Sequence, residues 1–234
     1  MSQTTATLLF LHGECLLRIP ADALLPRFGG LLLARHLPLA AGDRILDLGC
    51  GAGLVGITAA RRGHQVVAAD VLELCCRVTR SNALLNGVRD RVETRQGDLF
   101  RPVAGERFAL IAANPPQMPT PPDREWPDDT TSQMHDGGPD GWSLLARIIR
   151  EAPAHLAPGG RLAVTLFGFL GVERALAQFR AAGLAPRILA REIQPFPRLA
   201  RERLEHIRRL DGDGTLPAGR PAVCSRYVIC GEKA

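Results

Sequence analysis

Short apolar runs alternate with longer amphipathic stretches along most of this 234-residue chain. Runs rich in Val, Ile, Leu and Ala predict buried strands, whereas apolar residues spaced three or four positions apart predict helices. The strands are predicted at residues 44–48, 65–69, 91–96, 107–113, 161–167, 185–193 and 224–230, after short strands within 8–19. The helices are predicted at residues 24–37, 53–62, 71–86, 141–156 and 172–182.

Strands that alternate with helices predict a parallel sheet with helices on both faces. We therefore expect an α/β fold: a Rossmann-like, seven-stranded and mostly parallel sheet. The order changes after residue 193, where a long excursion precedes the strand at 224–230, so we expect this last strand to be antiparallel. The prediction is one domain over residues 1–234, with a segment at 1–43 that caps the substrate or cofactor. A cofactor-binding core follows at 44–193, and a helical excursion with the last strand at 194–234.

Composition adds few constraints. The chain is 46% hydrophobic and 23% charged, which is ordinary for a globular protein. No apolar run is long enough for a transmembrane helix, and the sequence MSQTTATLLF lacks the features of a signal peptide, so we expect a cytoplasmic protein with no membrane partner. The six cysteines and six histidines show no metal-ligand spacing, so we expect no metal and free thiols.

The basic charge is weak evidence for a nucleic-acid partner. The net charge is +5 and the pI about 9.2, but Lys233 is the one lysine among 29 basic residues. An arginine bias this strong reflects coding composition as much as function.

A glycine-rich turn follows the strand at 44–48. The segment DRILDLGCGAGLVG places Asp47 at the strand end and Gly49, Gly51 and Gly53 before the next helix. Glycines in this position let the backbone turn sharply and approach a ligand closely. The next strand ends at Asp70, near the roughly 20-residue spacing of an acid that binds ribose hydroxyls.

A dinucleotide is one of two kinds of cofactor that are compatible with this turn; the other carries a positive charge. The residues from Gly51 to Gly56 match the G-x-G-x-x-G pattern of dinucleotide-binding folds. Asp47 would repel a pyrophosphate, however, and would suit a cationic ligand. An NAD(P)-binding oxidoreductase and a non-catalytic nucleoside-binding module remain as alternatives of another class.

The D-L-G-C-G-A-G sequence, with Asp70 and then Gly97-Asp98-Leu99 after the following strands, resembles the class I S-adenosylmethionine-dependent methyltransferases. The resemblance implies S-adenosyl-L-methionine as cofactor and S-adenosyl-L-homocysteine as product. The implied cofactor contacts are Asp47 near the amino end of the methionine moiety, Gly49, Gly51 and Gly53 along it, Asp70 at the ribose, Asp98 at the adenine amino group, and Val71 and Leu99 as apolar walls.

Asn114-Pro115-Pro116-Gln117 ends the strand at 107–113, on the sheet edge where open α/β folds bind ligands. The two prolines lack backbone donors, which leaves the Asn114 side-chain oxygen and the Pro115 carbonyl as acceptors. Such acceptors suit a planar nitrogen that carries two hydrogens. We expect these four residues to act by positioning and electrostatics, with Asn114 also bordering the cofactor.

This motif resembles the N-P-P-(aromatic) signature of methyltransferases that modify planar nitrogens, and most closely the HemK-like release-factor glutamine methyltransferases. The stretches Leu25-Pro26-Arg27 and Gly137-Gly138-Pro139-Asp140-Gly141 support the resemblance, which covers roughly residues 24–180. Two departures put a protein substrate in question. Gln117 replaces the aromatic residue, and only 46 residues precede Asp47, so the family's N-terminal helical domain is not expected.

The irregular segment 117–141 is a candidate substrate lid. It holds five prolines, Trp126 and six acidic residues, which would repel a phosphate backbone and attract a cation. The alternative is that it is a solvated acidic loop with no role in binding. His135 is a candidate general base. The remaining candidate substrate-binding residues are Gln117, Arg27 and Arg198.

The arginine-rich stretch FPRLARERLEHIRRL at 196–210 is evidence in the other direction, for a nucleic-acid substrate. It could be an arginine-rich helix that contacts RNA, an amphipathic helix with a solvated face, or a cap over the substrate pocket.

These features together predict an N-methyltransferase that acts on a planar nitrogen (amide, guanidine or amine) of a small molecule. The acidic segment 117–141 favours a small molecule that is cationic. The alternative acceptors are a protein glutamine and an RNA base. The sequence does not indicate an oligomeric state.

Overall fold

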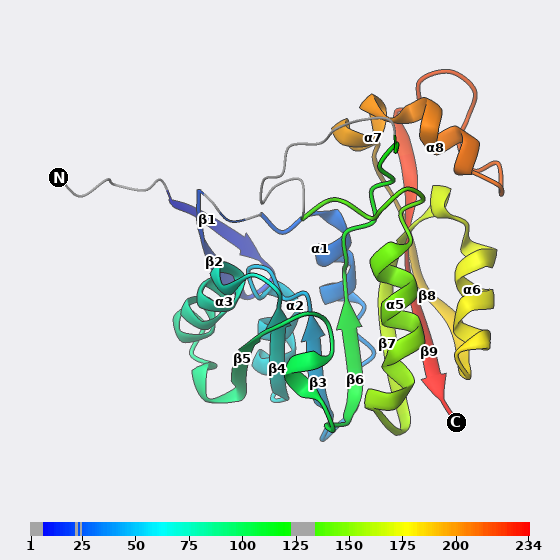
Figure 1. Ribbon diagram of the computed structural model, residues 1–234. Helices are drawn as coiled ribbons and strands as arrows, with labels where there is room; N and C mark the ends of the chain where they lie inside the picture. The colour runs from blue at the N-terminus through cyan, green and yellow to red at the C-terminus, as the bar shows by residue number, and fades with distance from the viewer. Residues whose placement is uncertain (1–6, 22, 24, 123–133) are drawn as a thin grey trace.

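A seven-stranded sheet forms the centre of the protein (Figure 1). The computed structural model describes residues 7–21, 23, 25–122 and 134–234. The strand order is β5-β4-β3-β6-β7-β9-β8. The strands are β3 (Arg44–Leu48), β4 (Gln65–Asp70), β5 (Val92–Gln96), β6 (Phe108–Ala113), β7 (Leu156–Phe167), β8 (Leu184–Pro195) and β9 (Val223–Lys233). β9 runs antiparallel between β7 and β8, while β3 to β7 are parallel, which confirms the predicted α/β fold.

Helices cover both faces of this sheet (Figure 1). One face carries α1 (Phe28–Arg35), α2 (Leu54–Arg61) and α3 (Glu73–Leu85), and the other carries α5 (Ser143–Glu151) and α6 (Val172–Ala181). Successive strand residues point to opposite faces, so Leu110 joins the apolar cluster under α1 and α2 while Ile111 joins the one under α5 and α6. Within the described residues, no helix has both the length and the hydropathy that a membrane crossing needs.

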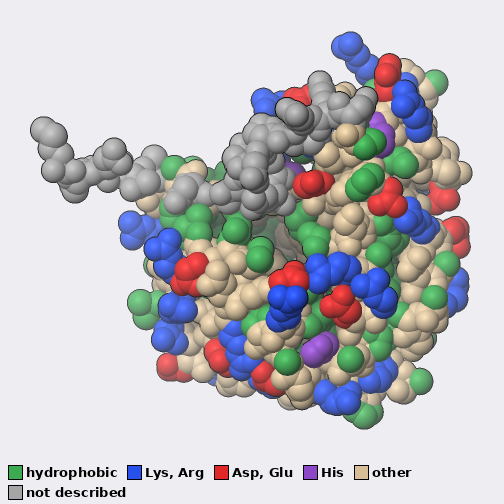
Figure 2. Space-filling model, viewed as in Figure 1, with side chains coloured by type: hydrophobic (Ala, Val, Ile, Leu, Met, Phe, Trp, Pro, Cys, Tyr) green, Lys and Arg blue, Asp and Glu red, His purple; other side chains and the backbone are tan. Residues whose placement is uncertain are grey.

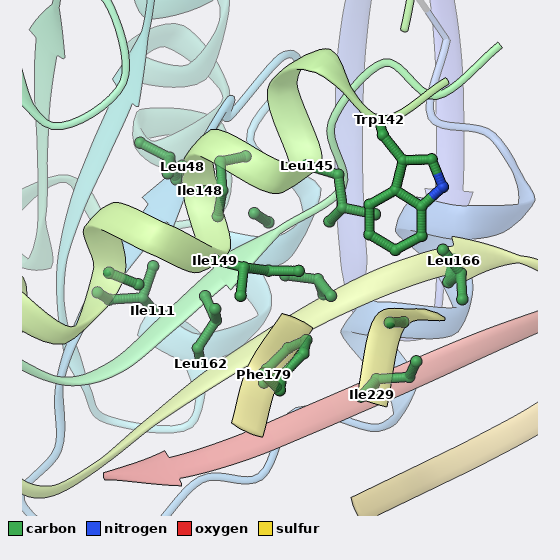
Figure 3. Close-up of a cluster of buried hydrophobic side chains, with 14 of the residues drawn as sticks. Leu48, Ile111, Trp142, Leu145, Ile148, Ile149, Leu162, Leu166, Phe179 and Ile229 are labelled. Atoms are coloured by element: carbon green, nitrogen blue, oxygen red, sulfur yellow. The ribbon is translucent and has the colours of Figure 1, made fainter. Parts of the chain in front are cut away.

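The cluster under α5 and α6 is the larger part of the core. Figure 3 shows Leu145, Ile148 and Ile149 of α5 above Ile111 and Leu162 of the sheet, with Phe179 of α6 beside them. These side chains are almost completely buried.

Phe179→Ala should lower the free energy of unfolding by roughly 3–5 kcal/mol, because it leaves a cavity in this cluster. Leu84→Ala is the matched control, since Leu84 is 68% exposed and its truncation should cost less than about 0.5 kcal/mol. Urea unfolding of both variants measures the difference. Equal losses would mean that Phe179 does not pack in the core in solution.

The strands predicted within 8–19 form a separate antiparallel hairpin of β1 (Thr7–His12) and β2 (Cys15–Pro20). Asn86, which follows α3, holds β2 in place. Its Oδ1 accepts a hydrogen bond from the Leu16 N–H, and its Nδ2 donates to the Leu16 carbonyl at 2.7 Å. Leu17 and Ile19 are thereby buried against α2 and α3.

Prolines shorten two of the predicted helices. The helix predicted at 24–37 is α1, which begins at Phe28 after Pro26 and ends at Arg35, before Pro38. Residues that precede proline disfavour the helical conformation. Pro153 has no backbone N–H to donate to the carbonyl of Ile149, so α5 ends at Glu151, and a 3-10 turn (Ala152–His155) replaces the end of the helix predicted at 141–156.

The excursion at 196–210 is two short helices rather than one. They are α7 (Arg198–Glu202) and α8 (Leu204–Leu210), separated at Arg203. Ile207 is fully buried, as the amphipathic interpretation requires. Arg203 is only 5% exposed, so it does not belong to a solvated basic face.

Candidate active site

The carboxyl ends of β3, β4 and β6 meet at one edge of the sheet (Figure 1). Leu48 of β3 is paired with Ala69 of β4 on one side and with Ala113 of β6 on the other. Asp70 and Asn114 each follow one residue later, so they flank the glycine-rich turn. Figure 2 shows a hollow in the surface above these strand ends.

The glycine-rich turn after β3 is left-handed at three positions. The φ angle is 75° at Gly49, 54° at Gly51 and 89° at Gly53, which residues with a Cβ atom rarely adopt. A Cβ added at Gly49 or Gly51 would meet no atom within 4 Å. The backbone therefore borders open space, where a ligand can approach it closely.

Asp47, at the end of β3, is only 3% exposed. Its Oδ2 accepts a hydrogen bond of 2.8 Å from the Gly56 N–H of α2. Burial raises the pKa of Asp47 to about 7; the hydrogen bond from Gly56 opposes this rise, and the charge of Asp70 adds to it. Ionisation of this carboxyl is costly unless a positive charge lies close by.

Asp70 ends β4 and is bonded directly to the turn. Its Oδ2 accepts from the Gly51 N–H and its Oδ1 from the Leu72 N–H, each at 3.0 Å. Burial raises the pKa of Asp70. The next residue, Val71, is 59% exposed, so a fixed carboxylate lies beside an uncovered apolar side chain.

Asp98, after β5, has a cationic partner that the sequence did not reveal. Arg147 of α5 donates to its Oδ2 at 2.8 Å, and this bond lowers the pKa of Asp98. Leu99 adopts a φ of 46°, which is uncommon without glycine. Any contact between Asp98 and an adenine amino group would share the carboxylate with Arg147.

Donors from two other strands hold the side chain of Asn114. Thr165 of β7 donates to Asn114 Oδ1 at 2.6 Å, and Arg226 of β9 donates to the same oxygen at 2.9 Å. The oxygen therefore faces the protein, which corrects the expectation of a free acceptor. The Pro115 carbonyl accepts no hydrogen bond from any residue that the structure describes, so it remains as the acceptor of this corner.

Gln117 anchors the corner to β7. Its side chain is 2% exposed. The Nε2 donates to the Thr165 carbonyl at 2.6 Å, and the Oε1 accepts from the Phe167 N–H at 3.2 Å. With both polar atoms engaged inside the protein, the direct substrate contact expected from the sequence does not fit this geometry.

The Gly137–Gly141 stretch packs against the same corner. The Gly137 N–H donates to the Met118 carbonyl at 2.9 Å, and the Met118 N–H donates to the His135 carbonyl at 3.0 Å. His135 is thus placed next to the corner through its backbone. Trp126 and the rest of residues 123–133 of the proposed lid lie outside the described residues.

The two arginines proposed to bind substrate lie apart from each other in the chain. Arg27 is exposed and precedes α1. Arg198 begins α7, with its side chain 94% exposed and 3.6 Å from Glu202. Arg203 contacts the segment that follows the corner, where it donates to the Pro119 carbonyl at 2.8 Å. Within the described residues, no three acidic, cysteine or histidine side chains gather as metal ligands would.

Three residues that surround Asn114 were not identified from the sequence as part of the site: Thr165, Arg226 and Gly29. A Cβ on Gly29 would lie 2.5 Å from Asn114 Oδ1 and 2.6 Å from Arg226 Nη2, so α1 approaches the corner through a bare glycine. Two signals could have found them. The Gly29-Gly30 pair is unusual in a helix, and Arg226 is a lone charge in the otherwise buried strand CSRYVIC.

Comparison with known proteins identifies the family. Residues 27–120 match the family model of the methyltransferase small domain. The chain is 30% identical to a putative protein N5-glutamine methyltransferase of Methanocaldococcus jannaschii, over 78% of this chain and 91% of that protein. It is 36% identical to a release factor glutamine methyltransferase of Cereibacter sphaeroides, over 68% of this chain but 59% of that longer relative.

A solved structure gives the same fold. The T. thermophilus 16S rRNA methyltransferase, in complex with AdoMet and guanosine, matches 98% of this chain and 50% of its own, with a TM-score of 0.61 and 18% identity. The family model and both relatives are methyltransferases, so they support neither the oxidoreductase nor the non-catalytic nucleoside-binding module. The chain therefore belongs to the HemK-like family of class I S-adenosylmethionine-dependent methyltransferases.

Proposed function

We propose that this protein methylates the side-chain amide nitrogen of a glutamine in a protein substrate. The relation to the M. jannaschii protein carries the proposal, because that relative is matched over 91% of its length and is named for glutamine N5 methylation. The rigid Asn114-Pro115-Pro116 corner beside the glycine-rich turn supports it. The small-molecule acceptor favoured from the sequence loses support, since the relatives are named for protein or ribosomal RNA substrates.

The residues at the sheet edge fit S-adenosylmethionine. Asp47 would attract the positively charged amino group, the open glycine turn would line the methionine moiety, and Asp70 would hold the ribose hydroxyls. The exposed Val71 side chain and Leu99 would cover the adenine ring. When bound, the cofactor supplies an electrophilic methyl group, so the substrate nitrogen gains a carbon bond, the sulfonium becomes a thioether, and one N–H proton passes to solvent.

The corner would act mainly by positioning. The Pro115 carbonyl would accept an N–H of the substrate amide and orient the nitrogen toward the methyl group. Hydrogen bonds from Gln117 to Thr165 and from Thr165 to Asn114 fix the corner to β7, so little conformational freedom has to be lost when the reaction occurs.

Cofactor affinity should depend on pH through Asp47. The pKa of Asp47 is raised to about 7, so the carboxylate becomes mostly protonated below that pH, and the dissociation constant should rise by up to about fivefold from pH 7 to pH 6. The unfolded chain loses this proton near its ordinary pKa, so ionisation destabilises the ligand-free protein as the pH rises toward 7. Asp47→Asn should bind S-adenosylmethionine weakly with a flat profile in calorimetric titrations. A flat wild-type profile would contradict this.

Methyl transfer from labelled S-adenosylmethionine into a cell extract tests the proposed function. The extract is separated afterwards into protein, RNA and small-molecule fractions, and labelled protein is digested and searched by mass spectrometry for N5-methylglutamine. We expect label in protein, at glutamine. Label confined to the small-molecule fraction would overturn the proposal.

An RNA base is the second candidate. Exposed arginines on α7 and α8 favour it: Arg198, Arg201, Arg208 and Arg209. Such a surface can hold a phosphate backbone. Ribonuclease-sensitive label in the RNA fraction would establish it instead.

A further inference from the structure

The helices α7 and α8 lie above the carboxyl end of β8, on the same edge of the sheet as the glycine-rich turn (Figure 1). β8 runs parallel to β7, because both strands pair antiparallel with β9. The excursion between β8 and β9, residues 196–222, therefore begins and ends at this edge. Phe196, Ala200 and Ile207 bury its apolar side in the core, so the excursion is fixed beside the site.

The segment that follows the corner forms a short stem next to this excursion. Its two limbs are residues 118–120 and 135–139. The Thr120 N–H donates to the Gly138 carbonyl at 2.8 Å, and Thr120 Oγ1 donates to Asp136 Oδ1 at 2.5 Å. These bonds hold the limbs together, so a contact to either limb restrains both.

The stem and Gly141 beyond it pack directly against Gln117 of the corner. A Cβ at Gly137 would lie 2.7 Å from the Gln117 carbonyl carbon, and a Cβ at Gly141 would lie 2.7 Å from the Gln117 carbonyl oxygen. Contacts this close leave no space for the stem to shift without moving Gln117. A change in the position of the stem is therefore passed on to the corner.

Two side chains of the excursion hold the stem, one on each limb. Arg203 is buried, and its Nη1 donates to the Pro119 carbonyl at 2.8 Å and to Thr120 Oγ1 at 3.0 Å. His206 Nε2 lies 2.6 Å from the Pro139 carbonyl. A carbonyl only accepts, so this nitrogen donates. Hydrogen bonds from a charged donor are stronger than those between neutral groups, so Arg203 makes the firmer of the two contacts.

Arg203 also separates the two helices. Its φ of −114° and ψ of 15° lie outside the helical region, so α7 ends at Glu202 and α8 begins at Leu204. A buried guanidinium costs free energy that an apolar side chain of the same size would not. The stability of the excursion therefore does not account for a cation at this position, whereas the contact with the stem does.

We propose that Arg203 and His206 are positioning residues that clamp the stem onto α8 and thereby hold the corner in place beside the bound methyl donor. This inference rests on the proposed function, because it takes the corner as the place of methyl transfer. The glycine-rich turn is held separately, through bonds such as that between Gly51 and Asp70. The clamp should therefore control kcat and leave cofactor affinity unchanged.

Arg203→Met removes the donors and keeps an unbranched side chain. We expect kcat to fall by roughly 10–100-fold, because a shift of about 1 Å in the corner is costly, with an unchanged dissociation constant for S-adenosylmethionine. Arg203→Lys keeps a charged donor and should recover part of kcat. Arg220→Met is the matched control, since Arg220 is an exposed arginine of the same excursion. A wild-type kcat in Arg203→Met, or a loss of cofactor binding that matches the loss of kcat, would overturn the proposal.

Hydrogen exchange measures the clamp without any substrate. In Arg203→Met and His206→Ala, peptides from both limbs of the stem should exchange faster, whereas peptides from β3 and α2 should not change. His206 is only partly buried, so His206→Ala decides the question if Arg203→Met does not fold, and its kcat should fall by about threefold to tenfold. Unchanged exchange in the stem, or equal acceleration along the whole chain of a folded variant, would refute the clamp.

Failure of the proposed function and failure of this inference give different results. A wild type that labels no glutamine refutes the proposed function, and hydrogen exchange still tests the clamp. A wild type that methylates glutamine, with kcat and stem exchange unaffected in Arg203→Met and His206→Ala, refutes the inference alone.

Discussion

Asn114→Ala should abolish most methyl transfer while S-adenosylmethionine still binds. The substitution removes the one side-chain group of the corner that can face the acceptor, and loss of a single such contact typically costs about 10²–10³-fold in kcat. The cofactor turn is held separately, through bonds such as that between Gly51 and Asp70. Single-turnover transfer of labelled methyl measures the effect, and calorimetry measures cofactor affinity.

The control for this variant is Gln65→Ala. Gln65 is an exposed amide at the opposite end of the sheet, where β4 begins, so its loss should leave kcat unchanged. An Asn114→Ala enzyme that keeps more than about a tenth of wild-type kcat would remove Asn114 from the site. A variant that no longer binds the cofactor would instead make Asn114 mainly a cofactor contact.

Gly137→Ala should have the second largest effect. A Cβ at this position would lie 2.7 Å from the Gln117 carbonyl carbon, 2.8 Å from Gln117 Cα and 2.8 Å from Gly141 Cα. All three are backbone atoms, so they cannot rotate away, and the corner itself must move. A displacement of about 1 Å in a catalytic group costs on the order of 10²-fold in rate, and we expect kcat to fall by about that factor.

Gly212→Ala is the matched control. Neither Gly137 nor Gly212 has a left-handed φ, and a Cβ at Gly212 would meet nothing within 4 Å. Both variants lose the same backbone freedom, so any difference between them reports the clash. Similar kcat values would show that the Gly137 stretch does not support the corner.

The grouping of the glycine-rich turn with Asp47 and Asp70 was predictable from the sequence because these residues are local. Asp47 and the glycines lie within one turn, and Asp70 ends the next strand. In a parallel sheet all such strand ends reach the same edge, so the order of motifs already indicates that they meet. The ends of the helices were predicted less accurately. Pro153 ends α5 earlier than the spacing of its apolar residues suggested.

The acceptor half depended on tertiary structure. Arg226 lies 112 positions from Asn114, and no periodicity connects them. The antiparallel insertion of β9 brings them together, and the fixed donors of Arg226 then decide which way the Asn114 amide turns. Gln117 shows the same limit, because its position in the motif suggested a substrate contact, whereas Thr165 and Phe167 engage both of its polar atoms inside the protein. The sequence by itself determined the fold class and the cofactor, because both follow from local pattern and strand order. The orientation of the Asn114 amide was decided by side chains that become neighbours only in the folded sheet.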